Sequence, residues 1–348
     1  MDLRPHLHSG HVIPAQPLAL DAHRKFSERH QRAITRYYVA AGTGGLAVGV
    51  HSTQFEIREP QHGLFQPVLE LASRTIDEEL ARSPRPFLKI SGVCGKTEQA
   101  LREATLAQSL GYHAGLLSLA AFRGDPEDAM IAHCQRVAEV FPIIGFYLQP
   151  SAGGRLLGYS FWRRFAEIPN VVAIKLAPFN RYQTIDVMRA LAESGRDDIA
   201  LYTGNDDSIV VDLLTPFTFE HRGRKVTRRI VGGLLGHWGV WTRSAVQLLA
   251  ELKRARAAVT LETRWLERAI AVTDMNAALF DAANGYHGCI PGILEVLRRG
   301  GLVPSIHCLN PHEVLSPGQA EELTRVARAY PELTDDAFVA ANRDRWLS

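Results

Sequence analysis

The sequence has few cysteines. Cys94, Cys134, Cys289 and Cys308 lie far apart in a chain of 348 residues, and none forms a CxxC pair. A disulfide-stapled secreted domain or a zinc knuckle needs more cysteines at closer spacing. We therefore expect four free thiols in a cytoplasmic protein.

Other signals are also missing. No apolar run has transmembrane length, and the opening MDLRPHLHSG does not read as a signal peptide. The net charge is only +2 and no basic stripe occurs, so neither nucleic acid nor a membrane surface is an expected partner. Beyond His6 and His8, the fourteen histidines give no HxH or HxxxH pair beside a carboxylate at the end of a predicted strand. A metal-dependent aldolase is therefore disfavoured, and we expect no metal.

Short apolar runs alternate with longer amphipathic stretches. Eight such runs, separated by helical patterns, predict a closed (β/α)8 TIM barrel over residues 1–255. A doubly wound sheet is the rival, but no GxGxxG follows a strand to support it. Residues 256–348 show successive helical patterns without strands, which predicts a helical C-terminal region packed on the barrel. The predicted strands lie at 11–18, 44–50, 86–93, 114–120, 142–148, 170–176, 199–204 and 228–236.

The run NVVAIKLAPF places Lys175 at the end of the sixth predicted strand. In a barrel that end opens on the active-site face, so the lysine is a candidate functional amine rather than a surface residue. A neutral amine can attack a ketone and form an iminium, which stabilises a carbanion on the adjacent carbon. Tyr147, at the end of the fifth predicted strand, is placed to transfer protons.

These segments resemble the dihydrodipicolinate synthase / N-acetylneuraminate lyase superfamily of class I aldolases. YLQP, with Tyr147 and Pro150, matches the family's strand-five motif, and IPNVVAIKLA matches its strand-six motif with the Schiff-base lysine at Lys175. The resemblance, over roughly residues 11–330, implies a barrel with a helical C-terminal region. It also implies a small 2-keto acid substrate, a covalent lysine Schiff base in place of a cofactor, and a homotetramer or dimer.

Where the family has Gly-Thr-Thr-Gly-Glu, this chain has VHSTQ. His51 stands at the threonine of the family's proton relay, so we expect it to hydrogen-bond Tyr147, directly or through a water, unless it only fills space. The aligned motifs also imply a set of substrate-binding residues. These are Ser52 and Thr53 in this segment, Gly204 and Asn205 in YTGND, and Trp238 in GGLLGHWG. Trp238 would shape the pocket mouth, or else pack within the barrel.

Other departures argue against a true dihydrodipicolinate synthase. Ala121 and Phe122 stand where the synthases carry two tyrosines, and Ala152 stands where they carry the arginine that grips the second substrate. Phe122 is expected to close the site instead, and whether Arg155 reaches the substrate is open. The long segment 216–229 reads as a solvated hairpin or a lid.

The leading interpretation is a Schiff-base lyase. It would cleave a C–C bond and release pyruvate, or remove water from a 2-keto-3-deoxy sugar acid. Deamination of a hydroxylated pyrroline would start from the same iminium. The alternatives are a keto-acid-binding barrel without catalysis, acting as a sensor or scaffold, and dihydrodipicolinate synthase proper.

Overall fold

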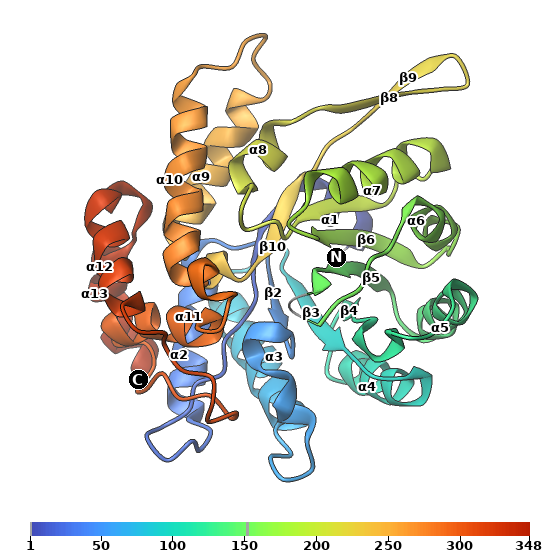
Figure 1. Cartoon of the computed structure of the whole chain (residues 1–348). Coiled ribbons are helices and arrows are strands. Elements are labelled where there is room, and N and C mark those ends of the chain that lie inside the picture. Colours follow the sequence, from blue (N-terminus) through green and yellow to red (C-terminus); the bar gives the residue numbers. More distant parts are fainter. Residues whose placement is uncertain (1, 151–152) are drawn as a thin grey trace.

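Eight parallel strands form a nearly closed barrel in the computed structural model, which describes residues 2–150 and 153–348 (Figure 1). Every predicted apolar run overlaps one of these strands, which confirms the predicted (β/α)8 fold. The seam between the first two strands is bridged by the backbone N–H of Gln16, which donates to the carbonyl of Ala47 at 2.8 Å. The strands are β1 (Val12–Pro14), β2 (Gly45–Val48), β3 (Leu88–Val93), β4 (Ala114–Leu117), β5 (Ile143–Leu148), β6 (Val171–Ala177), β7 (Ala200–Thr203) and β10 (Gly232–Leu235).

Helices connect the strands and cover the outside of the barrel (Figure 1). Their apolar faces and the outward side chains of the strands form one buried layer, and the inward side chains of the strands form a second, smaller cluster inside the barrel. Which layer a strand residue joins therefore decides whether it can reach the barrel mouth. The connecting helices are α2 (Glu28–Ala41), α3 (Phe65–Arg82), α4 (Thr97–Ser109), α5 (Glu127–Val140), α6 (Tyr159–Ala166), α7 (Arg181–Ser194) and α8 (Ile209–Leu214).

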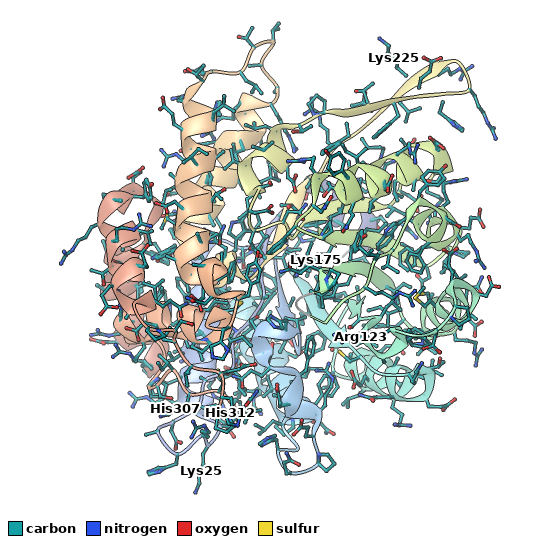
Figure 2. All side chains as sticks on the ribbon, in the orientation of Figure 1. Lys25, Arg123, Lys175, Lys225, His307 and His312 are labelled. Carbon is teal, nitrogen blue, oxygen red and sulfur yellow. The ribbon has the colours of Figure 1, made fainter. Side chains whose placement is uncertain are left out.

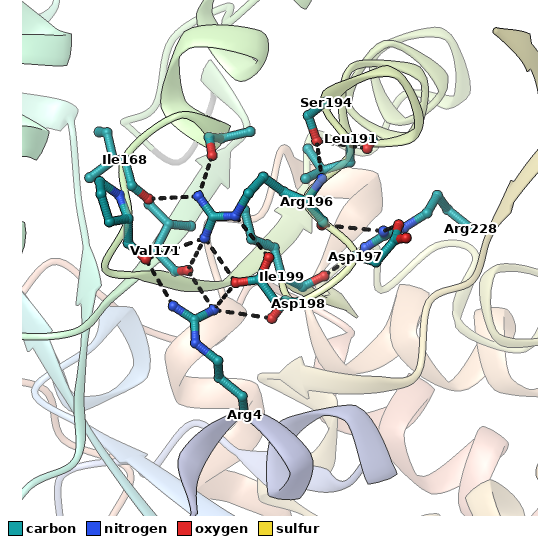
Figure 3. A network of polar contacts seen from close by, with 12 residues as sticks. Arg4, Ile168, Val171, Leu191, Ser194, Arg196, Asp197, Asp198, Ile199 and Arg228 are labelled. Carbon is teal, nitrogen blue, oxygen red and sulfur yellow. Dashed lines mark hydrogen bonds and ion pairs between the residues drawn. The ribbon is translucent and has the colours of Figure 1, made fainter.

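A short helix, α1 (Leu3–Ser9), packs at the start of β6, the strand that carries Lys175. Arg4 of this helix donates to the carbonyls of Pro169 at 2.8 Å and of Val171 at 3.2 Å (Figure 3). Arg4 and Arg196 both pair with the carboxylate of Asp198, which precedes β7. This network ties the entry points of two neighbouring strands together, at the barrel end opposite the predicted site.

The segment 216–229 is the hairpin that the sequence suggested. Strands β8 (Phe217–His221) and β9 (Arg224–Arg228) pair antiparallel and project beyond α7, and Lys225 lies far from Lys175 (Figures 1 and 2). At its base, Arg228 donates to the carbonyl of Ile199 at 2.8 Å. In this arrangement the hairpin does not cover the barrel mouth.

The last part of the chain is helical, as predicted, and no strand follows β10 in the described residues. Helix α9 packs against α8 and α2 of the barrel, and α10 packs against α8 and α12. No helix within 2–150 or 153–348 is both long and apolar enough to span a bilayer. The helices are α9 (Thr242–Ala255), α10 (Arg264–Leu279), α11 (Cys289–Arg299), α12 (Gln319–Ala329) and α13 (Asp336–Leu347).

Candidate active site

Lys175 lies inside the barrel, near the carboxyl end of β6 (Figure 2). Its side chain is buried, with 8% of its surface exposed. An irregularity in β6 puts it there, because Val172 and Ala173 both belong to the inner cluster although they are adjacent. With Val171 facing outward, regular alternation would have turned Lys175 outward as well. The extra residue reverses the alternation and brings the amine to the inside.

Tyr147 faces the opposite way, which corrects the sequence-based expectation for this residue. Strand β5 alternates regularly, with Ile143 and Tyr147 in the outer layer and Ile144 and Phe146 in the inner cluster. Phe146, and not Tyr147, therefore lies beside Lys175 on the inside of the barrel. The Tyr147 ring packs against Trp162 of α6, and its hydroxyl accepts a hydrogen bond from the backbone N–H of Leu157 at 3.2 Å.

A cavity of about 150 Å³ opens above Lys175 at the carboxyl ends of the strands. Residues in or just after β1, β2, β5, β6, β7 and β10 form its floor and walls, and residues that follow α10 form its roof. Tyr147 is not among the described residues that line it. The lining residues are Ala15, Val50, His51, Ser52, Phe146, Leu148, Gln149, Lys175, Ala177, Phe179, Gly204, Asp206, Gly236, Phe280, Gly285, Tyr286, Cys289 and Ile293.

The surroundings of Lys175 favour its neutral form. Burial lowers the pKa of this amine to about 8, and the charge of Asp206 opposes part of that shift. The amine lies 4.5 Å from the centre of the Phe146 ring. Gly204, a predicted substrate-binding residue, leaves room for the lysine, because a Cβ there would lie 2.6 Å from Lys175 Cε. At neutral pH a usable fraction of the amine is therefore free to act as a nucleophile.

Asp206 is a functional candidate that the sequence reasoning missed. Burial raises the pKa of its carboxyl group to about 7, although the Lys175 charge and the backbone N–H of His237 lower it. Its Oδ1 atom is buried without a hydrogen-bond partner in the described part of the chain. A carboxylate just after the strand next to that of the lysine was the available signal, because both strand ends meet at the barrel mouth. The group can accept or give a proton near neutral pH.

The segment His51-Ser52-Thr53 forms the 3-10 turn η1 (His51–Thr53) after β2, and two of its three side chains line the cavity. Burial and the nearby Lys175 charge lower the pKa of His51 to about 4, so its imidazole is neutral at pH 7. Ser52 donates its hydroxyl proton to the carbonyl of Ala15 at 2.9 Å. Thr53 is fully buried away from the cavity and donates to the carbonyl of Gln16 at 2.7 Å, so it shapes the turn rather than meeting a ligand.

The expected hydrogen bond between His51 and Tyr147 does not form. His51 lines the cavity inside the barrel, whereas Tyr147 is packed among the outer helices with its hydroxyl at Leu157. The two side chains lie on different faces of the strand layer, and no direct hydrogen bond between them is found in the described residues.

Asn205, another predicted substrate-binding residue, also points away from the cavity. Its amide donates to Asp212 at 2.9 Å and to Thr184 at 3.1 Å, and its Oδ1 accepts from the backbone N–H of Phe179 at 3.0 Å. Phe179 has a left-handed backbone (φ 51°) and lines the cavity. Asn205 therefore holds an aromatic wall of the site in place from behind.

Two further expectations, for Trp238 and Phe122, are corrected by the structure, and Arg155, whose role was open, is engaged elsewhere. Trp238 is buried in the outer core, against the backbone of Gly233, and does not line the cavity. Phe122 packs on His133 with ring centres 4.5 Å apart and does not close the site. Arg155 donates to the carbonyl of Phe122 at 2.6 Å and to that of Asp125 at 2.9 Å. Ala152 lies outside the described residues.

The roof of the cavity comes from the C-terminal helical region, which the sequence reasoning left without a function. Phe280, Tyr286 and Cys289 lie in or beside the loop between α10 and α11. The rings of Tyr286 and Phe179 meet edge to face with centres 5.8 Å apart. The sequence of this loop offers only a tyrosine and a cysteine near glycines as possible functional groups. Neither residue indicates a site unless the fold is known to bring the loop over the barrel.

All four cysteines are free thiols, as expected, and burial raises the pKa of each, to about 11 for Cys94. The Cys289 thiol at the cavity is therefore protonated at neutral pH and is a poor nucleophile. Within the described residues, no group of three or more His, Cys, Asp or Glu side chains is arranged to hold a metal ion.

Comparison with known proteins places the chain in a family. The model of the dihydrodipicolinate synthetase family matches residues 9–215. A 4-hydroxy-tetrahydrodipicolinate synthase of Aromatoleum aromaticum is 29% identical over 187 residues, which make up 53% of this chain and 59% of that enzyme. The matched part is thus less than two thirds of that relative. The 4-hydroxy-tetrahydrodipicolinate synthase of Marinobacter nauticus is 28% identical over 256 residues, which make up 72% of this chain and 76% of that enzyme.

Solved structures share the fold. A dihydrodipicolinate synthase from Thermotoga maritima superposes with a TM-score of 0.74 at 17% identity, over 93% of this chain and all of the other. An N-acetylneuraminate lyase from Fusobacterium nucleatum gives a TM-score of 0.70 at 15% identity, over 93% of this chain and 99% of the other. At such identities the likeness establishes the barrel and its C-terminal helices, not the reaction.

Proposed function

The chain belongs to the dihydrodipicolinate synthetase family, and we propose that it is a Schiff-base-forming lyase that acts on a small 2-keto acid. The observation that carries this proposal is the position of Lys175. Its amine has a lowered pKa and lies in a largely apolar cavity at the barrel end where catalytic groups of this fold gather. The lysine itself supplies the covalent chemistry, and the proposal needs no added cofactor.

The neutral amine of Lys175 attacks the C2 carbonyl carbon, and the carbonyl oxygen leaves as water. The resulting iminium accepts the electron pair of the next bond to break. If the C3–C4 bond of a 4-hydroxy-2-keto acid breaks, the C4 hydroxyl proton must pass to a base and an aldehyde departs. If a C3–H bond breaks and the C4 hydroxyl leaves, the outcome is dehydration.

Asp206 is the carboxylate placed to take that proton. It shares the cavity with Lys175, and its Oδ1 atom has no hydrogen-bond partner in the described part of the chain. A base with a pKa near the working pH is effective because it is present in both of its protonation states. Ser52 is proposed to hold the keto-acid carboxylate, which requires its hydroxyl to turn from the Ala15 carbonyl to the ligand.

We propose further that the chain is not a dihydrodipicolinate synthase. Lys175 is the only cation among the described lining residues, since His51 is neutral, and it is consumed by the Schiff base. Residues 151–152, which lie outside the described part, are a serine and an alanine and bring no charge. Arg155 is occupied by two backbone carbonyls. A second substrate with its own carboxylate therefore lacks a partner.

Product analysis tests the proposal. A panel of 4-hydroxy-2-keto acids and 2-keto-3-deoxy sugar acids should contain a compound that is turned over, with pyruvate formed for C–C cleavage or a new 2,5-dicarbonyl or enone product for loss of water. Lys175→Met is the matched control, because it keeps the unbranched apolar stem and removes the amine. Turnover by the Lys175→Met variant at the parent rate would refute the Schiff-base mechanism.

One observation supports the rival interpretation, a keto-acid-binding barrel without catalysis. The presence of Tyr147 beside Lys175 in the motif argued against it, and the structure places Tyr147 outside the cavity. Such a protein would bind 2-keto acids, with or without an adduct on Lys175, but would turn none over and would not exchange their C3 protons with solvent.

A further inference from the structure

The loop over the cavity presents a phenol whose hydroxyl is not used within the protein. Tyr286 lines the cavity together with Lys175 and Asp206. No hydrogen bond to its hydroxyl is found in the described residues. Burial, and then the charges of Asp207 and Asp206, keep the pKa of this phenol above its usual value. It is therefore a protonated O–H group on a residue that lines the cavity of the reactive amine.

The backbone that carries Tyr286 is held in an unusual conformation. Its φ is +69°, and Asp281 at the start of the same loop has a φ of +57°. Residues with side chains rarely adopt this left-handed region, and such outliers gather where function requires a fixed geometry. The carboxylate of Asp281 holds the loop, since it accepts hydrogen bonds from the backbone N–H of Gly288 at 3.0 Å and from the hydroxyl of Ser316.

Two further contacts hold Tyr286, one through its backbone and one through its ring. The backbone N–H of Tyr286 donates to the carbonyl of Asp281 at 3.0 Å, and its ring meets Phe179 edge to face. Phe179 is held in turn by Asn205. The phenol is thus clamped between the barrel and the C-terminal region before any substrate arrives, as a group that must meet a reacting atom should be.

We propose that Tyr286 is the proton-transferring phenol of this site, in the role that the sequence motif assigns to Tyr147. The inference rests on the proposed Schiff-base function. Tyr147 cannot serve, because its hydroxyl is bound to the Leu157 N–H on the outer face of the barrel. Tyr286 reaches the site from the C-terminal region of the same chain.

C–C cleavage proceeds with two proton transfers. Asp206 takes the proton of the C4 hydroxyl as the C3–C4 bond breaks, and the electron pair moves onto the iminium nitrogen to give an enamine. The Tyr286 O–H bond then breaks as its proton forms a C–H bond at C3, which restores the iminium. The phenolate regains a proton from the Asp206 carboxyl group, and water releases pyruvate from Lys175. One proton moves from oxygen to C3 overall.

Exchange of the methyl protons of pyruvate with deuterium oxide isolates this step, because it requires only the iminium, the enamine and the phenol. We expect Tyr286→Phe to lower the exchange rate by about 10²–10⁴, the usual size of an acid–base contribution. Reductive trapping of pyruvate on Lys175 should persist, since the amine is untouched. Tyr147→Phe, the matched control, should exchange at nearly the parent rate.

Tyr286→Phe exchange near the parent rate, with the fold retained by circular dichroism, would overturn the role of Tyr286, as would a large loss in Tyr147→Phe alone. If Tyr286→Phe fails to fold, Tyr286→Trp and Phe179→Leu provide second tests of the same clamp, and normal exchange in both would also overturn it. An absence of any pyruvate adduct in the parent protein would instead refute the Schiff-base function, and this inference with it.

Discussion

Lys175 and Gly204 face each other across strands β6 and β7 at a distance that leaves no room for a side chain at position 204. A Cβ there would lie 2.6 Å from Lys175 Cε and 2.8 Å from the Ala177 Cβ. The lysine stem can move, but Ala177 cannot move without the strand. The glycine is therefore the surface against which the reactive amine is positioned.

Gly204→Ala should consequently displace the amine rather than unfold the barrel. A misplacement of a reacting group by about 1 Å can cost about 10² in rate, and we expect a loss of that order in the rate of adduct formation with pyruvate. The measurement is reductive trapping followed by mass spectrometry, with thermal unfolding as the check on folding. An unchanged trapping rate in a folded variant would show that the contact does not position Lys175.

The pH dependence of trapping should follow the amine of Lys175. The rate of reductive trapping should rise as the pH passes through about 8, where the Lys175 ammonium loses its proton. Asp206 stabilises the ammonium, so removing its charge in Asp206→Asn should move the midpoint to lower pH. His51→Gln should not move it, because that imidazole is neutral in this range. A midpoint that rises in Asp206→Asn would contradict the assigned electrostatics.

Tyr147→Phe should affect stability more than chemistry. It leaves the buried N–H of Leu157 without its acceptor, which costs about 1–3 kcal/mol of unfolding free energy. Denaturant unfolding measures that loss, and Trp162, packed on the ring, offers a fluorescence signal. Unchanged stability together with lost activity would place the hydroxyl in the site after all.

The sequence predicted the strands but not this tyrosine, and the reason is physical. Continuous apolar runs identify buried parallel strands, and the position of Lys175 at the end of such a run predicted that it lies at the barrel mouth. The motifs placed Tyr147 and Lys175 at neighbouring strand ends but did not show which face each side chain takes. Regular alternation in β5 turns Tyr147 outward with Ile143, whereas the extra residue in β6 turns Lys175 inward. The extra residue in β6 is invisible in the apolar pattern, because Val172 and Ala173 are both small and apolar.

The residues that form the roof of the cavity could not be predicted from the sequence, for a different reason. Tyr286 follows Lys175 by more than a hundred residues and belongs to a loop between two helices. Nothing in its local pattern shows that this loop folds back over the barrel. Ser52 and Gly204, which the aligned motifs implied, line the cavity, whereas Thr53, Asn205 and Trp238 also follow strands but turn into the outer core. Position in the chain predicts the end of the barrel, not the direction of a side chain.

Lysine biosynthesis should not be supported by this protein. Losing a charge-assisted contact to the carboxylate of the second substrate costs about 1.5–3 kcal/mol, and the cavity offers no replacement for it. We expect no condensation of pyruvate with aspartate semialdehyde above the rate of the Lys175→Met variant. Rescue of a strain that lacks dihydrodipicolinate synthase would contradict this expectation.

The central claim is that the Lys175 amine forms a covalent bond with a 2-keto acid. The most direct measurement is incubation of the whole protein with pyruvate and with 2-oxobutyrate in the presence of borohydride, followed by intact mass and peptide mapping. We predict one reduced adduct for each chain, on the peptide that contains VVAIKLAPF, and none in Lys175→Met. A folded parent protein whose mass is unchanged by both acids, or an adduct on a lysine other than Lys175, would contradict the account.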